Sequence, residues 1–208
     1  MLFRSHASST ISTGIRHVIE FDPLVIRAMA KWPDVPAVYG WLRLDRRGQW
    51  WLIDRGRPDF DEARDGLGSS ITSPPIIDFI GRNYASDHLG RWFWQNGPQR
   101  VYVTLDCAPF VLRVLGGGTS ARMVTHTGAV FEGVQRAAVG PDGEILLASD
   151  SACGVVHDLD AAALDLQIQG AATLLQIGDQ CLTLEPCADP PGAFGFIRSP
   201  GQIGRAHV

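Results

Sequence analysis

The chain has 208 residues, of which 45% are hydrophobic and 19% are charged, and its formal net charge is −4. This balance is typical of a globular domain and excludes an intrinsically disordered chain. No apolar run approaches the roughly 18 residues that cross a bilayer, and the N-terminus lacks the pattern of a secretory signal. We therefore expect no membrane partner, and the net negative charge argues against a nucleic-acid partner.

The two ends of the chain look foreign to the rest of the sequence. Read back into codons, residues 1–5 and residues 203–208 correspond to the two ends of a common sequencing-library adapter. We therefore expect both segments to be adapter-derived. Residues 1–21 as a whole are predicted to be a flexible lead-in, and residues 187–208 a tail.

The first half of the chain contains signals for two helices and two hairpins. Asp22-Pro23 is typical of a helix start, and a second helix is expected near Pro74-Pro75. Gly48 and the Asn96-Gly97 pair are typical of tight turns between strands. An exposed, charged loop is expected over 55–70. The predicted strands cover 38–44, 50–53, 90–95, 100–105 and 109–115.

The second half repeats this pattern in part, since a turn glycine followed by a polar residue and an apolar run recurs at Gly48, Gly90 and Gly143. A helix is expected from Asp158 to about Leu166. Strands are predicted over 123–126, 134–139, 144–148, 173–177 and 181–184. The short connections predict an α+β fold of mainly antiparallel sheets with a few short helices. We expect two similar hairpin-helix-strand lobes, over 22–115 and 121–186, joined by a linker at 116–120.

The cysteines indicate a reducing environment. Cys107, Cys153, Cys181 and Cys187 include no C-x-x-C pair. We interpret them as reduced, mostly buried thiols of a cytoplasmic protein. The spacing does not support a zinc site with His126 or His157, so we expect no metal and no cofactor.

The segment from Arg82 to Arg100 carries most of the candidate site residues. In the strand at 91–95, Trp92 and Trp94 share one face, and Arg91 and Gln95 share the other. If the tryptophans face the core, the planar donors opposite them suit a carboxylate or a phosphate. The competing interpretation is that these side chains stack and cap at the surface. The candidate ligand-binding residues are Arg82, Asn83, Tyr84, Gln95, Asn96, Gln99, Arg100 and His126.

His126 lies at a predicted strand end before Gly128. A histidine there can carry a proton or anchor a ligand, or it can be a hydrogen-bonded residue at the edge of the core. No G-x-S-x-G motif accompanies it, so no catalytic residue is assigned from the sequence.

Several segments resemble an uncharacterised proteobacterial family, a domain of unknown function, over about residues 24–200. They are Lys31 to Leu42, Arg82 to Tyr84, Gly90 to Val101 and His126 to Gly128. The order of motifs is also distantly similar to the two-repeat domain of unknown function 1285, at Ile71 to Pro74, Gly90 to Val101 and Ala108 to Phe110. The resemblance implies a bacterial α+β protein with repeated motifs, a signalling or ligand-binding role and no known reaction. Asn96-Gly-Pro-Gln stands where that family tends to have a Thr-Pro-Val-Glu-like turn.

These observations favour a small-ligand-binding or regulatory module for an anionic ligand. One alternative is a hydrolase or transferase with His126 as general base, so the sequence leaves open whether the protein is an enzyme. Another is an interaction module that forms a homodimer through the tryptophan-rich hairpins, which predicts Trp50, Trp51 or Trp94 in one exposed patch. A binding site instead predicts that Arg82, Arg100 and His126 converge on one pocket.

Overall fold

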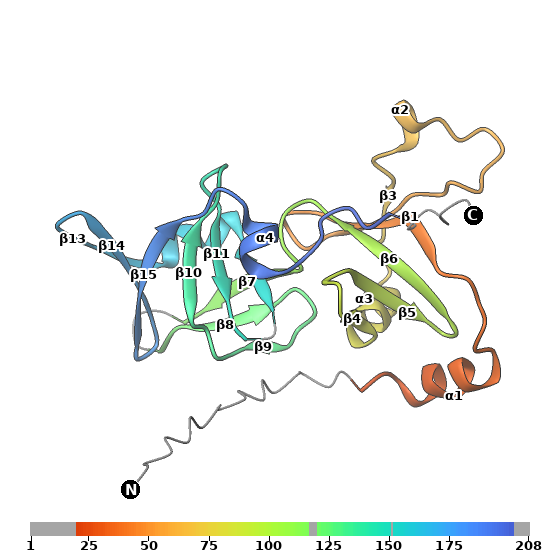
Figure 1. The fold of residues 1–208 in the computed structure, drawn as a ribbon, viewed down its shortest axis with the longest axis horizontal. Coiled ribbons are helices and arrows are strands. Elements are labelled where there is room, and N and C mark those ends of the chain that lie inside the picture. Colours follow the sequence, from red (N-terminus) through yellow and green to blue (C-terminus); the bar gives the residue numbers. More distant parts are fainter. Residues whose placement is uncertain (1–19, 117–119, 151, 202–208) are drawn as a thin grey trace, which may run out of the picture.

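A computed structural model describes residues 20–116, 120–150 and 152–201 (Figure 1). The two segments expected to be adapter-derived, most of the expected lead-in and residues 117–119 of the expected linker lie outside the described residues. The described residues form two β-sheets with short helices around them.

The first sheet has six strands in the order β3-β2-β1-β6-β5-β4. β1 and β6 pair in parallel, and the other neighbours pair antiparallel. Its strands are β1 (Val38–Leu44), β2 (Trp50–Leu52), β3 (Ser69–Ser70), β4 (Tyr84–Ser86), β5 (Trp92–Asn96) and β6 (Gln99–Leu105).

The second sheet has nine strands in the order β13-β14-β15-β10-β11-β12-β7-β8-β9. Two of its pairs, β10 with β15 and β12 with β7, are parallel. Its strands are β7 (Phe110–Leu115), β8 (Arg122–Thr125), β9 (Val130–Phe131), β10 (Arg136–Val139), β11 (Ile145–Ala148), β12 (Cys153–Val156), β13 (Asp165–Gln169), β14 (Ala172–Ile177) and β15 (Gln180–Pro186).

The helices are short and lie outside the sheets. They are α1 (Pro23–Lys31), α2 (Glu62–Asp65), α3 (Pro74–Arg82), the 3-10 helix η2 (Asp158–Ala163) and α4 (Pro190–Phe194). Both α1 and α3 begin with proline, as predicted, because proline has no N–H to satisfy and its φ suits the first helical turn. None of the described helices is both long and apolar enough to cross a membrane.

The predicted fold class is confirmed: the chain is an α+β protein with mainly antiparallel sheets and a few short helices. The parallel pairs were not expected. They join strands that are far apart in the sequence, and such long connections permit a parallel return. The charged loop over 55–70 also holds the short elements α2 and β3.

Three strands in the second half were missed, namely β9, β12 and β13. β12 contains a central glycine, Gly154, which weakens the strand signal. The helix expected to reach Leu166 is wrong at its C-terminal end, because η2 stops at Ala163 and Leu164 adopts an extended backbone with φ −74° and ψ 136°. The alternating residues that follow form β13 instead.

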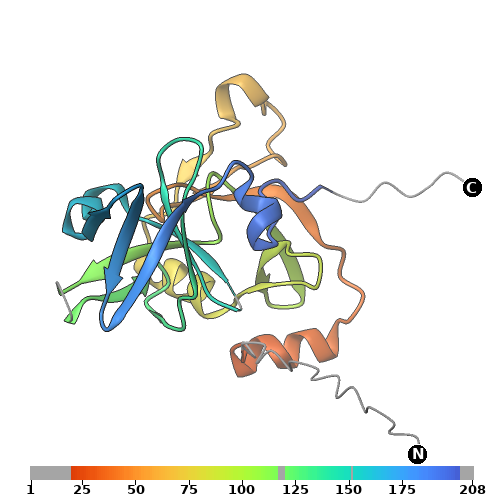
Figure 2. The same cartoon turned by 60° about the vertical axis from the view of Figure 1, so that its left-hand side comes forward.

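Both sheets contribute to one hydrophobic core. Leu42, Trp50 and Val103 of the first sheet pack in the same cluster as Leu146 and Val155 of the second. Figure 2 shows the ribbons of the two sheets next to each other. The division into lobes at 22–115 and 121–186 stays a prediction. However, β7, the last strand of the expected first lobe, pairs with β8 and β12 in the nine-stranded sheet. The expected tail contains α4 and the buried Phe196.

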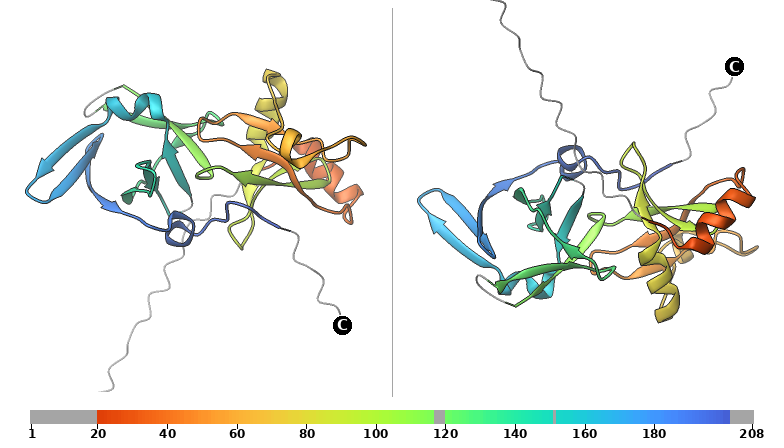
Figure 3. Two further views of the ribbon diagram at one scale, coloured as in Figure 1. Left: turned by 90° about the horizontal axis from the view of Figure 1, so that it is seen from above. Right: turned by 90° about the horizontal axis from the view of Figure 1, so that it is seen from below.

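The opposite face of the six-stranded sheet has a smaller core of its own. Phe93 and Tyr102 are buried there, and the ring of Tyr39 stacks on Tyr102 with centroids 4.6 Å apart. Phe21 covers Phe93, so this residue of the expected lead-in belongs to the fold. Helix α1 lies along the side of the first sheet that holds β4, β5 and β6 (Figures 1 and 3).

Candidate functional site

A pocket of about 370 Å³ lies between the end of α1 and the β5–β6 hairpin. Its apolar wall includes Met29, Trp32 and Pro33 from α1 and the segment that follows. Gln95 of β5 and Arg100 of β6 supply hydrogen-bonding groups from the hairpin. The pocket therefore combines an apolar wall with one amide and one guanidinium group, which is the usual composition of a small-molecule site.

The geometry of the hairpin places Gln95 beside Arg100. The two residues are partners in the antiparallel register of β5 and β6, so their side chains leave the same face of the sheet. The loop between the strands is Gly97-Pro98, one residue later than predicted. Gly97 has a φ of +56°, which is favourable for glycine at the first position of a two-residue loop.

Gln95 carries an unused acceptor in this pocket. Its side chain is only 2% exposed, and its Nε2 donates a hydrogen bond to the carbonyl oxygen of Gly97 at 3.0 Å. Its Oε1 is inaccessible to water and accepts no hydrogen bond from any described residue. A buried acceptor without a donor costs about 1–3 kcal/mol, so a ligand N–H or O–H would be stabilising once a rotation of the Gln95 amide turns Oε1 toward the pocket.

Arg100 is the cationic group of the pocket. Its guanidinium carbon lies 4.0 Å from the centroid of the Phe93 ring, and no carboxylate of the described residues forms an ion pair with it. Arg91 on the same face differs, because it pairs with Asp87 at 2.7 Å. Burial raises the pKa of Tyr102, whose hydroxyl accepts a hydrogen bond from Arg91 at 3.1 Å and donates one to Asp87 at 3.0 Å. The positive charge of Arg100 is therefore available to an anionic ligand.

Three other predicted residues support the hairpin and α1. Asn96 is exposed beside the turn, and Nε2 of Gln99 donates to the carbonyl oxygen of Pro36 at 3.3 Å. Asn83 is fully buried: its Oδ1 accepts from the backbone N–H of Asp22 at 3.0 Å, and its Nδ2 donates to the carbonyl oxygen of Phe79 at 2.9 Å. Asn83 therefore connects the start of α1 to the end of α3.

The remaining predicted residues lie outside this pocket. Arg82, in the last turn of α3, pairs with Asp78 and with Asp22, the latter at 3.2 Å. Tyr84 is buried, and its hydroxyl donates to the carbonyl oxygen of Pro109 at 3.0 Å. The centroids of the Tyr84 and His126 rings are 6.0 Å apart, so the structure brings these two together in an aromatic cluster with Trp50. Arg82 and His126 do not line the pocket with Arg100.

His126 is a packed residue at the edge of the core. Its Nδ1 accepts the backbone N–H of Val111 at 3.2 Å, and its Nε2 is inaccessible and has no hydrogen-bond partner among the described residues. Burial lowers the pKa of His126 to about 3, with a small opposing effect of the Asp45 carboxylate. The ring is therefore neutral near pH 7 and no water reaches its Nε2, which is unfavourable for the general-base alternative.

The tryptophan-rich hairpins do not present an exposed patch containing Trp50. That ring is 1% exposed and packs in the core. Trp51 is half-buried: Nε1 donates to the Asp45 carboxylate at 2.8 Å, and the Arg43 guanidinium covers the ring at 5.1 Å. Of the three tryptophans that the interaction-module alternative offered for one exposed patch, Trp50 is buried in the core, and Trp51 and Trp94 are half-buried.

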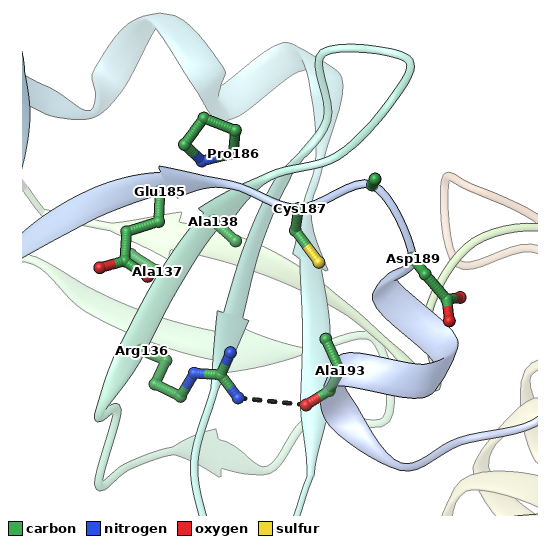
Figure 4. A pocket seen from close by; sticks show the side chains of 9 residues that line it. Arg136, Ala137, Ala138, Glu185, Pro186, Cys187, Asp189 and Ala193 are labelled. Atoms are coloured by element: carbon green, nitrogen blue, oxygen red, sulfur yellow. Dashed lines mark hydrogen bonds between the residues drawn. The ribbon is translucent and has the colours of Figure 1, made fainter.

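A second pocket of about 360 Å³ lies between β10, β15 and α4 (Figure 4). Its cation, Arg136, donates to the carbonyl oxygen of Ala193 at 3.1 Å and lies 4.7 Å from the Phe194 ring centroid. Glu185 and Asp189 also line this pocket. The Arg136 guanidinium is already hydrogen-bonded, and the carboxylates of Glu185 and Asp189 line the same pocket. This pocket therefore suits an anion less well than the pocket between α1 and the β5–β6 hairpin.

The cysteines of the described residues are free thiols. Cys107 and Cys153 are buried, and burial raises the pKa of Cys107 to about 11. Cys181 is exposed and Cys187 is half-buried. Within the described ranges, no group of three or more His, Cys, Asp or Glu side chains is placed to hold a metal ion.

The fold defines the class of the protein as α+β. A family model described as "Protein of unknown function (DUF2946)" matches residues 21–201, and the chain belongs to that family. This agrees with the resemblance to an uncharacterised domain seen in the sequence. No curated protein matches the chain.

Two solved structures are similar to this chain. A DUF1285 family protein from Silicibacter pomeroyi DSS-3 is 18% identical, with a TM-score of 0.51 over 78% of this chain and 86% of its own. A DUF1285 family protein from Shewanella baltica OS155 is 13% identical, with a TM-score of 0.41 over 59% of this chain and 87% of its own. The first similarity supports the distant likeness to the 1285 domain at the level of the fold.

Proposed function

We propose that the protein is a binding module for a small organic carboxylate, held in the pocket between α1 and the β5–β6 hairpin. The observation that carries this proposal is the pairing of a buried, unpartnered acceptor, Gln95 Oε1, with a guanidinium that has no carboxylate partner, Arg100. Arginine is suited to a carboxylate because its planar donors can make two parallel hydrogen bonds.

The ligand that fits carries three features. Its carboxylate binds Arg100, and an N–H or O–H near the carboxylate donates to Gln95 Oε1. An apolar group packs on Met29, Trp32 and Pro33. Small hydroxy acids and N-acylated amino acids have this arrangement, and a volume of about 370 Å³ is at the lower end of the range for small-molecule sites. The four free thiols agree with a cytoplasmic location, which is part of the proposal.

A thermal-shift screen of small carboxylates and phosphates tests the proposal on wild type and Arg100→Gln. The matched control is Arg122→Gln, since Arg122 is exposed on β8 in the other sheet and forms no ion pair with the described residues. A binding carboxylate should raise the melting temperature of wild type and of Arg122→Gln. The response of Arg100→Gln should require at least about tenfold more ligand, because a charged hydrogen bond contributes about 1.5–3 kcal/mol. The proposal is wrong if no carboxylate stabilises wild type, or if Arg100→Gln responds equally.

A further inference from the structure

One end of the nine-stranded sheet differs from the other sheet edges in the described chain. The edge strands β3, β4 and β9 have two or three residues each, which leaves few unpaired backbone groups. β13 has five residues, all of them exposed, and pairs only with β14. The β13–β14 hairpin extends away from the body of the molecule (Figures 1 and 3).

Apart from Asp165 at its start, β13 lacks the charged residues and prolines that usually protect an exposed edge. Its sequence, Asp-Leu-Gln-Ile-Gln, contains no lysine, arginine or proline. Leu166 is 43% exposed and Ile168 is 83% exposed. Since Leu166 is opposite the buried Leu175, both apolar side chains continue the core face of the sheet into solvent.

The hydrogen-bonding groups of Leu166 and Ile168 point outward. The hairpin loop is Gly170-Ala171, so the flanking pair Gln169 and Ala172 closes the hairpin. In an antiparallel ladder, alternate residues direct their N–H and C=O groups to opposite sides. Gln169 and Gln167 therefore direct their backbone N–H and C=O groups toward β14. Leu166 and Ile168 direct theirs to the open edge of the sheet.

We propose that β13 pairs antiparallel with β13 of a second copy of this chain, about a two-fold axis at Gln167. The sequence is self-complementary in this register. Leu166 of each copy lies opposite Ile168 of the other, and the free N–H and C=O groups of these residues form four hydrogen bonds. Asp165 lies opposite Gln169, so no like charges meet.

The proposed contact is small, and its strength should be modest. Five residues from each copy bury less area than the roughly 1,200 Å² of a stable protein interface. The dimer should therefore form and dissociate reversibly at micromolar concentrations. This inference does not depend on the ligand proposal, because β13 shares no residue with the α1 pocket.

A charge exchange at the two-fold axis tests the proposal by sedimentation velocity of the full chain. Gln167→Lys places two lysines directly opposite each other, and Gln167→Glu places two glutamates there. Each variant alone should dimerise at least about tenfold more weakly than wild type, whereas an equimolar mixture should recover the dimer. Gln167 is exposed, so neither variant buries a charge in the monomer.

Thr183→Lys is the matched control. Thr183 is exposed in the same cross-strand row, opposite Leu174, but on the interior strand β15. This variant should dimerise like wild type. A wild-type chain that remains monomeric up to about 200 μM overturns the proposal, as do single Gln167 variants that dimerise like wild type or a mixture that does not recover the dimer.

Discussion

Gln95 and Arg100 are cross-strand partners in the β5–β6 hairpin, and their side chains meet in one pocket under the end of α1. One residue offers a buried acceptor and the other a cation without a carboxylate partner. Arg91 on the same face shows the structural alternative, because Asp87 neutralises it. The contrast between the two arginines is the physical basis of the ligand proposal.

Replacing Gln95 by leucine should separate stability from binding. The change removes an unpartnered buried acceptor together with the hydrogen bond from Nε2 to the Gly97 carbonyl oxygen, and because these two effects oppose each other the free energy of unfolding should stay within about 1 kcal/mol of wild type. Ligand affinity should fall, because the ligand donor loses its partner. Gln176→Leu is the control: Gln176 makes the equivalent bond, from Nε2 to the Gly178 carbonyl oxygen at 2.7 Å, in the β14–β15 hairpin. Urea unfolding measures the stability of each variant, and titration of the ligand measures its affinity. A Gln95→Leu variant that binds the ligand as tightly as wild type would contradict the role of Gln95.

Gly90 should not tolerate a side chain. Its φ is +76°, and a Cβ there would lie 2.2 Å from the carbonyl oxygen of Gly195. Gly90→Ala should cost about 3 kcal/mol or more, since the strain of the left-handed backbone adds to a clash with main-chain atoms. Gly128→Ala isolates the strain, because Gly128 has a φ of +89° and its Cβ would meet no atom within 4 Å. It should cost about 1 kcal/mol in urea unfolding. Equal losses would argue against the close packing of the 195–197 segment on Gly90 and Arg91.

His126 should make the protein less stable as the pH falls below about 6.5. Burial holds the pKa of His126 at about 3 in the folded chain, below the usual value of about 6.5 in an unfolded chain. Between these values the unfolded chain binds a proton that the folded chain does not bind, so stability decreases by up to about 1.4 kcal/mol per pH unit. The loss attributable to His126 from pH 7 to pH 5 is about 2 kcal/mol.

Urea unfolding at pH 7, 6 and 5 measures this dependence. His126→Gln keeps an acceptor for the Val111 N–H and should have a shallower pH slope than wild type. The control His88→Gln, at an exposed histidine, should retain the wild-type slope. An unchanged slope in His126→Gln would show that the ring takes up protons in the folded state.

The sequence predicted local features better than distant contacts. Turn glycines and alternation predicted the β5–β6 hairpin and the opposite faces of Trp92 and Gln95, since both depend on neighbouring residues. The closure of the pocket by α1 depends on a hydrogen bond between Asp22 and Asn83, which are 61 residues apart. No local pattern contains that information.

The dependence on contacts between distant residues also explains why some candidate residues do not line the same pocket. Arg82, Asn83 and Tyr84 are adjacent in the sequence, but the end of α3 directs them to Asp22, to the backbone and to the aromatic cluster. His126 joins Tyr84 because β8 returns beside β7, which the sequence did not specify. The first two residues of β13 were expected to be helical, because Asp158 is a good helix start. The length of η2 depends instead on its tertiary context.

The most direct test is calorimetric titration of the best carboxylate from the screen into wild type, Arg100→Gln, Gln95→Leu and the double variant. The account predicts that each single variant binds at least about tenfold more weakly than wild type. It also predicts a coupling between the two residues, because one ligand bridges them. Wild-type affinity in Arg100→Gln would contradict the assignment of this pocket as a carboxylate site.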